Sequence, residues 1–219
     1  MALKVLYEDN HIIAVVKPAG ILSQGDASGE PSIMDDVKKY LKEKYKKPGK
    51  VFLGLLHRLD RPVSGIMVFA KTSKGASRLS EQFRSHTIEK TYQAIVVGKP
   101  EKNRGVLTNK LGKDIKSMKA REFEDGKEAK LFYETVESNG KYSLLKIKID
   151  TGKFHQIRSQ LSLAGFPIVG DIKYGSKEAL PDETIALCAT GISFDAATEV
   201  KRVNLAIDFP EEWAKYLDF

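Results

Sequence analysis

An aspartate between two arginines stands at residues 56–65, which read LHRLDRPVSG. Arg58 and Arg61 favour the ionised form of the Asp60 carboxyl. A carboxylate in a fixed position can act as a nucleophile or exchange protons with a substrate. Apolar runs on both sides predict that the segment is a loop between buried strands, where functional groups are commonly held. An aspartate in a salt-bridged turn would give the same pattern.

Two further segments carry polar groups in defined settings. Tyr92 lies in an apolar stretch at 89–98 that is typical of a strand, where a tyrosine usually belongs to the core or its rim. Residues 151–158, TGKFHQIR, follow a strand and open a helix. Arg158 falls outside the helical stripe made by Ile157, Leu161 and Ala164, so it need not point into the core. An exposed helical arginine is the simpler interpretation.

Several common kinds of site are excluded by the sequence. It has no glycine-rich nucleotide loop, no G-x-S-x-G and no H-E-x-x-H. With four dispersed histidines and one cysteine, Cys188, we predict no metal site and no cofactor. A retaining glycoside hydrolase would need a second carboxylate near Asp60, and none stands out in these segments.

The elements that must position these groups are short and alternate irregularly. Strands are predicted at 11–17, 65–71, 89–98, 129–137, 141–149 and 200–207, and Asn139-Gly140 is a strong hairpin signal. Helices are predicted after Ser32, from Ser73, around Ile157–Ala164 and at 211–217. Because strands often follow strands, we expect an α+β fold with a mixed, largely antiparallel central sheet flanked by helices, as one domain over 1–219.

Composition indicates an ordinary globular protein with a basic surface. The chain has 219 residues, 36 Lys and Arg against 29 Asp and Glu, and a net charge of +7. This excess favours a polyanionic partner. Lysines gather at 38–47, either as the solvated face of a helix or as a track for phosphates. Without a signal peptide, a long apolar run or a second cysteine, we expect a cytoplasmic monomer that does not bind membranes.

Five segments in order resemble the RluA-type family of RNA pseudouridine synthases. That family carries an H-R-L-D-x-x-T-S-G motif with a catalytic aspartate, a K-x-Y-x-A strand and a later G-R-x-H-Q-I-R-x-H segment ending in G-D-x-x-Y-G. The matching segments are VVKPAGI at 15–21, HRLDRPVSG at 57–65, KTYQA at 90–94, GKFHQIRSQ at 152–160 and GDIKYG at 170–175.

The resemblance implies conversion of uridine in RNA to pseudouridine without a cofactor. It makes Asp60 the nucleophile, and leaves open whether the carboxylate attacks C1′ or C6 or removes a ribose proton. Arg158 would hold that carboxylate ionised and aimed. Tyr92 would pack on the uracil and take part in removing the C5 proton, although a phenol is a weak base at neutral pH.

The resemblance also implies that the target base is flipped out of its stack, with Arg58 entering the gap. The partner would be a structured stem-loop of ribosomal or transfer RNA. Residues expected to contact the RNA are His57, Arg58, Arg61, His155 and Gln156.

The chain departs from the family pattern at three positions. Val63, Lys153 and Gln160 replace the usual threonine, arginine and histidine. None of these changes affects Asp60, Tyr92 or Arg158, so they bear on the choice of substrate. The chain starts at the first catalytic-domain strand, and we expect no N-terminal S4-like domain. A non-catalytic RNA-binding protein is the alternative, but it would not need all three catalytic side chains.

Overall fold

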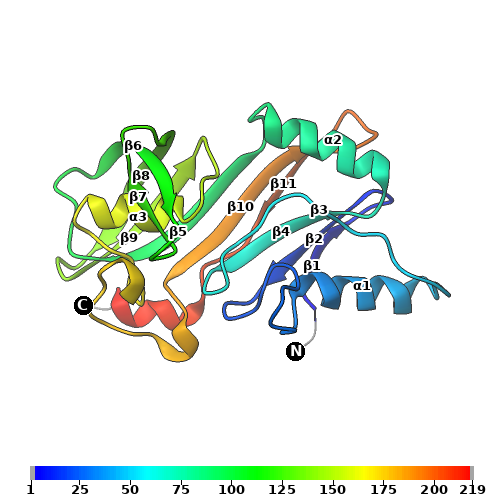
Figure 1. The fold of residues 1–219 in the computed structure, drawn as a ribbon, viewed down its shortest axis with the longest axis horizontal. Coiled ribbons are helices and arrows are strands. Elements are labelled where there is room, and N and C mark those ends of the chain that lie inside the picture. The colour runs from blue at the N-terminus through cyan, green and yellow to red at the C-terminus, as the bar shows by residue number, and fades with distance from the viewer. Residues whose placement is uncertain (1–2, 218–219) are drawn as a thin grey trace. The chain divides into compact units, whose positions relative to one another are not determined.

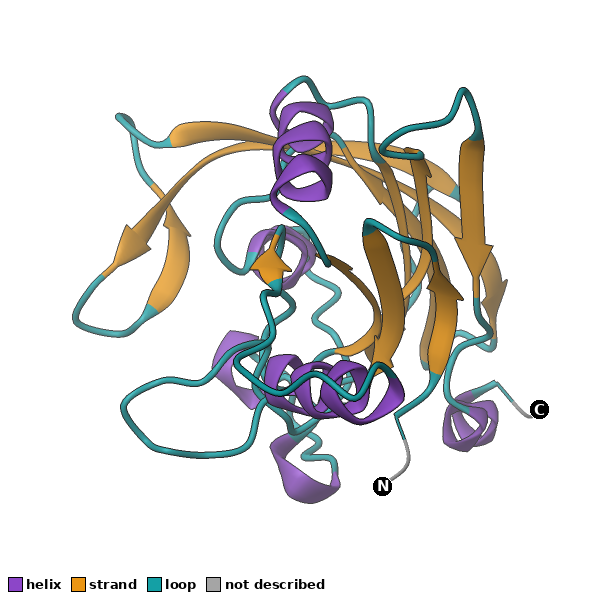
Figure 2. Ribbon diagram, turned by 90° about the vertical axis from the view of Figure 1, so that its right-hand side faces the viewer, coloured by secondary structure: helices purple, strands orange, loops and turns teal. Residues whose placement is uncertain are grey.

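A computed structural model describes residues 3–217, which form two compact units. Of the described residues, the first unit comprises 3–88 and 191–207, and the second comprises 89–190 and 208–217. Strand β10 (Leu187–Asp195) begins in the second unit and ends in the first. Figure 1 labels the elements of both units, and Figure 2 shows that strands predominate over helices.

The first unit is built on three adjacent antiparallel strands. β2 lies between β1 and β4, and Ile12–Lys17 pairs with Gly65–Ala70. The strand order continues from β4 to β10, which pairs with β11. A short strand, β3, pairs with the end of β4. The bounds are β1 (Val5–Glu8), β2 (Ile12–Lys17), β3 (Gly54–Leu55), β4 (Ser64–Ala70) and β11 (Arg202–Ala206).

Two helices lie on opposite sides of these strands (Figure 1). Helix α1 (Ile33–Lys44) starts at Ser32, whose side chain accepts a hydrogen bond from the Asp35 amide, as predicted. Helix α2 (Ser73–Arg84) is capped in the same way by Thr72. Leu79 of α2 packs into the core of this unit, among residues such as Ile12 and Phe194. Both faces of the strands are therefore covered by a helix.

The second unit is an antiparallel sheet of long strands. The order is β10, β5, β9, β8, β6, β7, and neighbouring strands from β5 onward are antiparallel. The predicted hairpin at Asn139-Gly140 is confirmed, and the Asn139 side chain accepts hydrogen bonds from two amides of the turn. The bounds are β5 (Glu89–Val97), β6 (Arg104–Asp114), β7 (Lys119–Glu122), β8 (Lys127–Ser138) and β9 (Tyr142–Ile149).

Helix α3 (Gln156–Leu163) is the principal helix of the second unit. It contacts β6, β7 and β8, and its residues 156–161 are all buried. Three short 3₁₀ segments also belong to this unit: η1 (Ile172–Tyr174), η2 (Pro181–Glu183) and η3 (Glu211–Tyr216).

The predicted α+β class and the mixed sheet are confirmed. Several strands, however, were not predicted. β1, β3, β6, β7 and β10 were not expected from the sequence. Along β6 exposed and half-buried residues alternate, because one face of this strand is open to solvent. One domain over 1–219 stays a prediction. Among residues 3–217, no helix has the length and apolar character needed to cross a membrane.

Candidate active site

Asp60 occupies the loop between β3 and β4 in the first unit and is half-buried. The loop is hydrogen-bonded to residues 17–23 beside it. The Ser23 hydroxyl donates to the Leu59 carbonyl at 2.5 Å and accepts from the Leu59 amide at 3.1 Å. On the other side of Asp60, the Gly20 amide donates to the Arg61 carbonyl at 2.8 Å. The backbone on both sides of the aspartate is therefore fixed.

Lys17 is a further member of this region to which sequence reasoning assigned no role. Its side chain is fully buried at the end of β2, and Nζ donates to the carbonyls of Pro18, Ile21 and Arg61 at 2.9, 2.8 and 3.2 Å. An ammonium group has three donors, so these carbonyls use its full capacity. Burial lowers the pKa of Lys17 to about 7, while the negative charge of Asp60 acts in the opposite direction.

The other predicted residues of this loop differ in their surroundings. His57 Nε2 accepts the Val68 amide at 3.0 Å, and its ring lies 5.1 Å from that of Phe83, so the imidazole anchors the loop on β4. Arg58 is exposed. Arg61 is also exposed and pairs with Glu30 at 2.9 Å, while its Nε donates to the Gly20 carbonyl.

Tyr92 and Arg158 belong to the second unit. Tyr92 is 8% exposed on β5, in register with Ile147 of β9. The simpler interpretation of Arg158 as an exposed helical arginine is wrong. Its guanidinium is buried and donates to both carboxylate oxygens of Asp171, Nε at 2.7 Å and Nη2 at 2.9 Å. Because α3 is short and buried on all sides along 156–161, no outward face exists at this residue.

Tyr174 joins Arg158 to the residue that precedes α3. Its ring centroid lies 5.0 Å from the Arg158 guanidinium carbon. Its hydroxyl accepts the Ala120 amide at 2.6 Å and bonds to His155 Nδ1 at 2.9 Å. Asp171 and Tyr174 both lie in GDIKYG, so this segment was the available signal for them.

The amide of Gln156 is engaged within the second unit. Its oxygen accepts from the Thr151 hydroxyl at 2.7 Å and the Lys153 amide at 3.0 Å, and its nitrogen donates to the Lys130 carbonyl at 3.1 Å. Gln156 thus ties the turn before α3 to β8. RNA contacts by this residue, and by His57, Arg58, Arg61 and His155, remain predictions.

Comparison with known proteins identifies the family to which this sequence is similar. Residues 11–163 match the family described as RNA pseudouridylate synthase. A ribosomal large subunit pseudouridine synthase C of Rickettsia typhi is 34% identical over 215 residues, covering 94% of this chain and 68% of the relative. An uncharacterized RNA pseudouridine synthase, YlyB of Bacillus subtilis, is 27% identical over 222 residues, covering 100% and 73%.

The fold agrees with this family. Human RNA pseudouridylate synthase domain containing 4 superposes with a TM-score of 0.80 at 23% identity, over 98% of this chain and 91% of the human chain. The chain belongs to the RNA pseudouridylate synthase family. It is an RNA-modifying isomerase, which converts uridine in RNA to pseudouridine.

Proposed function

We propose that this enzyme modifies specific uridines of large-subunit ribosomal RNA, with the Asp60 carboxylate as its nucleophile. The observation that carries the proposal is the HRLD segment with Asp60, within a chain 34% identical to a ribosomal large subunit pseudouridine synthase. The net charge of +7 supports a polyanionic partner. Transfer RNA is the second candidate substrate.

The reaction is an isomerisation and needs no redox partner. The N1–C1′ bond of uridine breaks, the uracil turns, C5 bonds to C1′, the C5 proton leaves and N1 gains a proton. A carboxylate can divide this change into easier steps by bonding covalently to the substrate. The fixed backbone at Leu59 and Arg61 supports this role, because a positioned nucleophile loses little freedom when the substrate binds.

Arg158 and Tyr92 are the proposed helpers of Asp60. In this proposal the guanidinium of Arg158 holds the Asp60 carboxylate ionised and oriented. The bidentate pair with Asp171 sets the plane of that guanidinium before RNA arrives. Tyr92 would pack on the uracil and take part in removing the C5 proton.

The target base must leave its stack to react, at a cost of a few kcal/mol. We assign Arg58 to the gap that the base leaves, since its side chain is exposed and a guanidinium plane stacks well on bases. The substrate would be a stem-loop whose target is readily unstacked. A cytoplasmic monomer is the form that we expect to act.

Mapping pseudouridines in total RNA from cells with and without this gene tests the proposal. We expect at least one site in large-subunit ribosomal RNA to disappear in the deletion strain and to return with the wild-type gene but not with Asp60→Asn. Loss of sites only in transfer RNA would reject the ribosomal substrate, and an unchanged map would reject the proposed function.

A further inference from the structure

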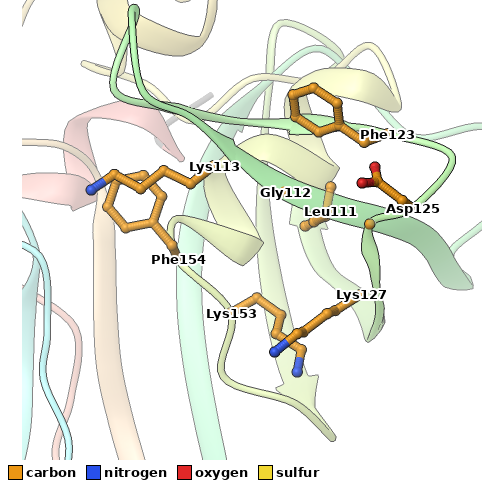
Figure 3. Close-up of a pocket in the computed structure, with 9 residues that line it drawn as sticks. Leu111, Gly112, Lys113, Phe123, Asp125, Lys127, Lys153 and Phe154 are labelled. Carbon is orange, nitrogen blue, oxygen red and sulfur yellow. The ribbon is translucent and has the colours of Figure 1, made fainter.

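A hollow of about 420 Å³ lies in the second unit, at the end of β6 where β7 and β8 meet the turn before α3 (Figure 3). Two of its walls are the exposed aromatic rings Phe123 and Phe154. Three lysines and one acid complete the polar part of the lining. These are Lys113, Lys127, Lys153 and Asp125. Its size falls within the range of roughly 300–1,000 Å³ that is usual for small-ligand sites.

Phe123 follows β7, and its ring lies against Gly112 of β6. A Cβ atom at residue 112 would come within 2.7 Å of the ring, so only glycine lets the ring lie against the strand there. The Phe123 amide donates to the Lys110 carbonyl at 3.0 Å, and its carbonyl accepts from the Gly126 amide at 3.0 Å. A Cβ atom at residue 126 would meet the Lys110 backbone at 2.6 Å, so this turn is equally tight. The ring is nevertheless 39% exposed.

The opposite wall is also fixed by the protein. The Phe154 ring stacks on that of His155 with centroids 3.8 Å apart, and Lys113 Nζ lies 4.9 Å from the Phe154 centroid. The amide of Lys153 is bound by Gln156. A site whose walls are already ordered has little conformational entropy to lose on binding.

The charge of the hollow is positive. In Figure 3 the side chains of Lys127 and Lys153 come from opposite sides and their amino ends converge. Among residues 3–217, no carboxylate lies within ion-pair distance of Lys113, Lys127 or Lys153. Ammonium groups that converge without an ion-pair partner repel one another, and an anion placed between them lowers this repulsion. Lysine binds phosphate as a compact point charge.

We propose that this hollow binds one unpaired nucleotide of the substrate RNA, a nucleotide other than the target uridine. Its base stacks on the Phe123 ring, and its phosphate lies between Lys127 and Lys153. Stacking on an aromatic side chain and neutralising a phosphate are the two contacts by which proteins hold single-stranded nucleic acid. This inference rests on the proposed function, because it takes RNA to be the ligand.

Phe123→Leu tests the stacking contact, since it keeps an apolar side chain but removes the ring. With a fluorescein-labelled single-stranded RNA decamer, we expect the Kd to rise about tenfold. Phe123→Trp should restore binding. The quenching of 2-aminopurine placed in the decamer should be lost in Phe123→Leu and kept in Phe123→Trp. Equal affinity and equal quenching in wild type and Phe123→Leu would overturn the assignment.

Lys127→Gln with Lys153→Gln tests the phosphate contact. Each single-strand phosphate contributes a slope of about 0.7 to the plot of log K against log salt, so removing one contact should lower the slope by about that amount. Lys102→Gln is the matched control, because this exposed lysine precedes the far end of β6, roughly 30 Å away. An unchanged slope in the double variant, or an equal change in the control, would contradict the proposal.

Two further ligands separate the alternatives. A blunt RNA duplex and a ten-residue polyglutamate peptide should bind with little dependence on Phe123. Equal dependence of the duplex or the peptide on Phe123 and on the two lysines would reject an unpaired nucleotide as the ligand. Pseudouridine formation on ribosomal RNA from the deletion strain is measured in parallel. Inactive wild type rejects the proposed function, whereas active wild type with variants that bind normally rejects only this site.

Discussion

Arg158 and Asp171 form a bidentate ion pair inside the second unit, with N–O distances of 2.7 and 2.9 Å. Both side chains are almost fully buried, at 7% and 1% exposure. Such a pair gains little net stability over apolar residues, but losing one partner leaves a buried charge uncompensated. The pair is therefore better explained by the need to hold a guanidinium in one orientation than by the stability of the fold.

Asp171→Asn should lower the free energy of unfolding by roughly 3 kcal/mol, because the Arg158 guanidinium keeps its charge and loses its carboxylate. Chemical denaturation measures this change. Arg158→Met combined with Asp171→Leu should recover most of the stability and none of the activity. Asp171→Asn with wild-type stability and activity would show that the pair orients nothing.

Lys17→Met should flatten the dependence of stability on pH. The folded pKa of Lys17 is about 7, below its ordinary value of 10.5, so between these values the unfolded chain binds more protons at this side chain. The free energy of unfolding then rises with pH from about 7 to 10.5, by at most about 1.4 kcal/mol per unit, and is unaffected by Lys17 below 7. Denaturation across this range measures the slope, with the exposed Lys74→Met as control. Identical slopes for wild type and Lys17→Met would contradict the assignment.

Asp60→Asn should abolish pseudouridine formation while RNA affinity stays within a few-fold. The amide has nearly the shape of the carboxylate but is not a nucleophile. Single-turnover assays and filter binding measure the two quantities. Asp36→Asn, on the exposed side of α1, is the control and should keep full activity. Turnover by purified Asp60→Asn near the wild-type rate would rule out the nucleophile.

Tyr92→Phe should slow the single-turnover rate about 10²-fold or more if the phenol moves a proton, and change the Kd for RNA little. Tyr133→Phe is a close control, because Tyr133 and Tyr92 are both in register with Ile147 and therefore share one face of the sheet. A wild-type single-turnover rate in Tyr92→Phe would exclude proton transfer by the hydroxyl and restrict Tyr92 to a packing role.

Arg58→Ala should lower the single-turnover rate on a structured RNA more than the rate on an unpaired oligonucleotide that contains the same target. Only the structured substrate requires the gap in the stack to be filled. The ratio of the two single-turnover rates isolates this effect from general loss of charge, for which the exposed Arg78→Ala on α2 is the control. Equal losses on both substrates would exclude a role in flipping.

The sequence predicted those parts of the molecule that local rules decide. The cap at Ser32 and the turn at Asn139-Gly140 act within a few residues, and both are present. The inward position of Arg158 was missed because its partner follows 13 residues later and helical periodicity says nothing about tertiary ion pairs. Burial of Lys17 was missed for a similar reason, since the Arg61 carbonyl that it binds comes 44 residues later in the chain.

The path of the chain through the two units has a consequence for synthesis on the ribosome. β4 has β10 as its neighbour on one side, yet β10 follows more than a hundred residues after β4. Because synthesis adds ~5–20 residues per second, β10 is made about 5–25 s after β4, and the β4 edge that pairs with it is unpaired during this time. During this interval the loop that carries Asp60 is already made, but its strand is half-paired. The nascent chain thus exposes an unpaired strand edge beside the loop that carries Asp60, and unpaired edges of this kind are prone to aggregation.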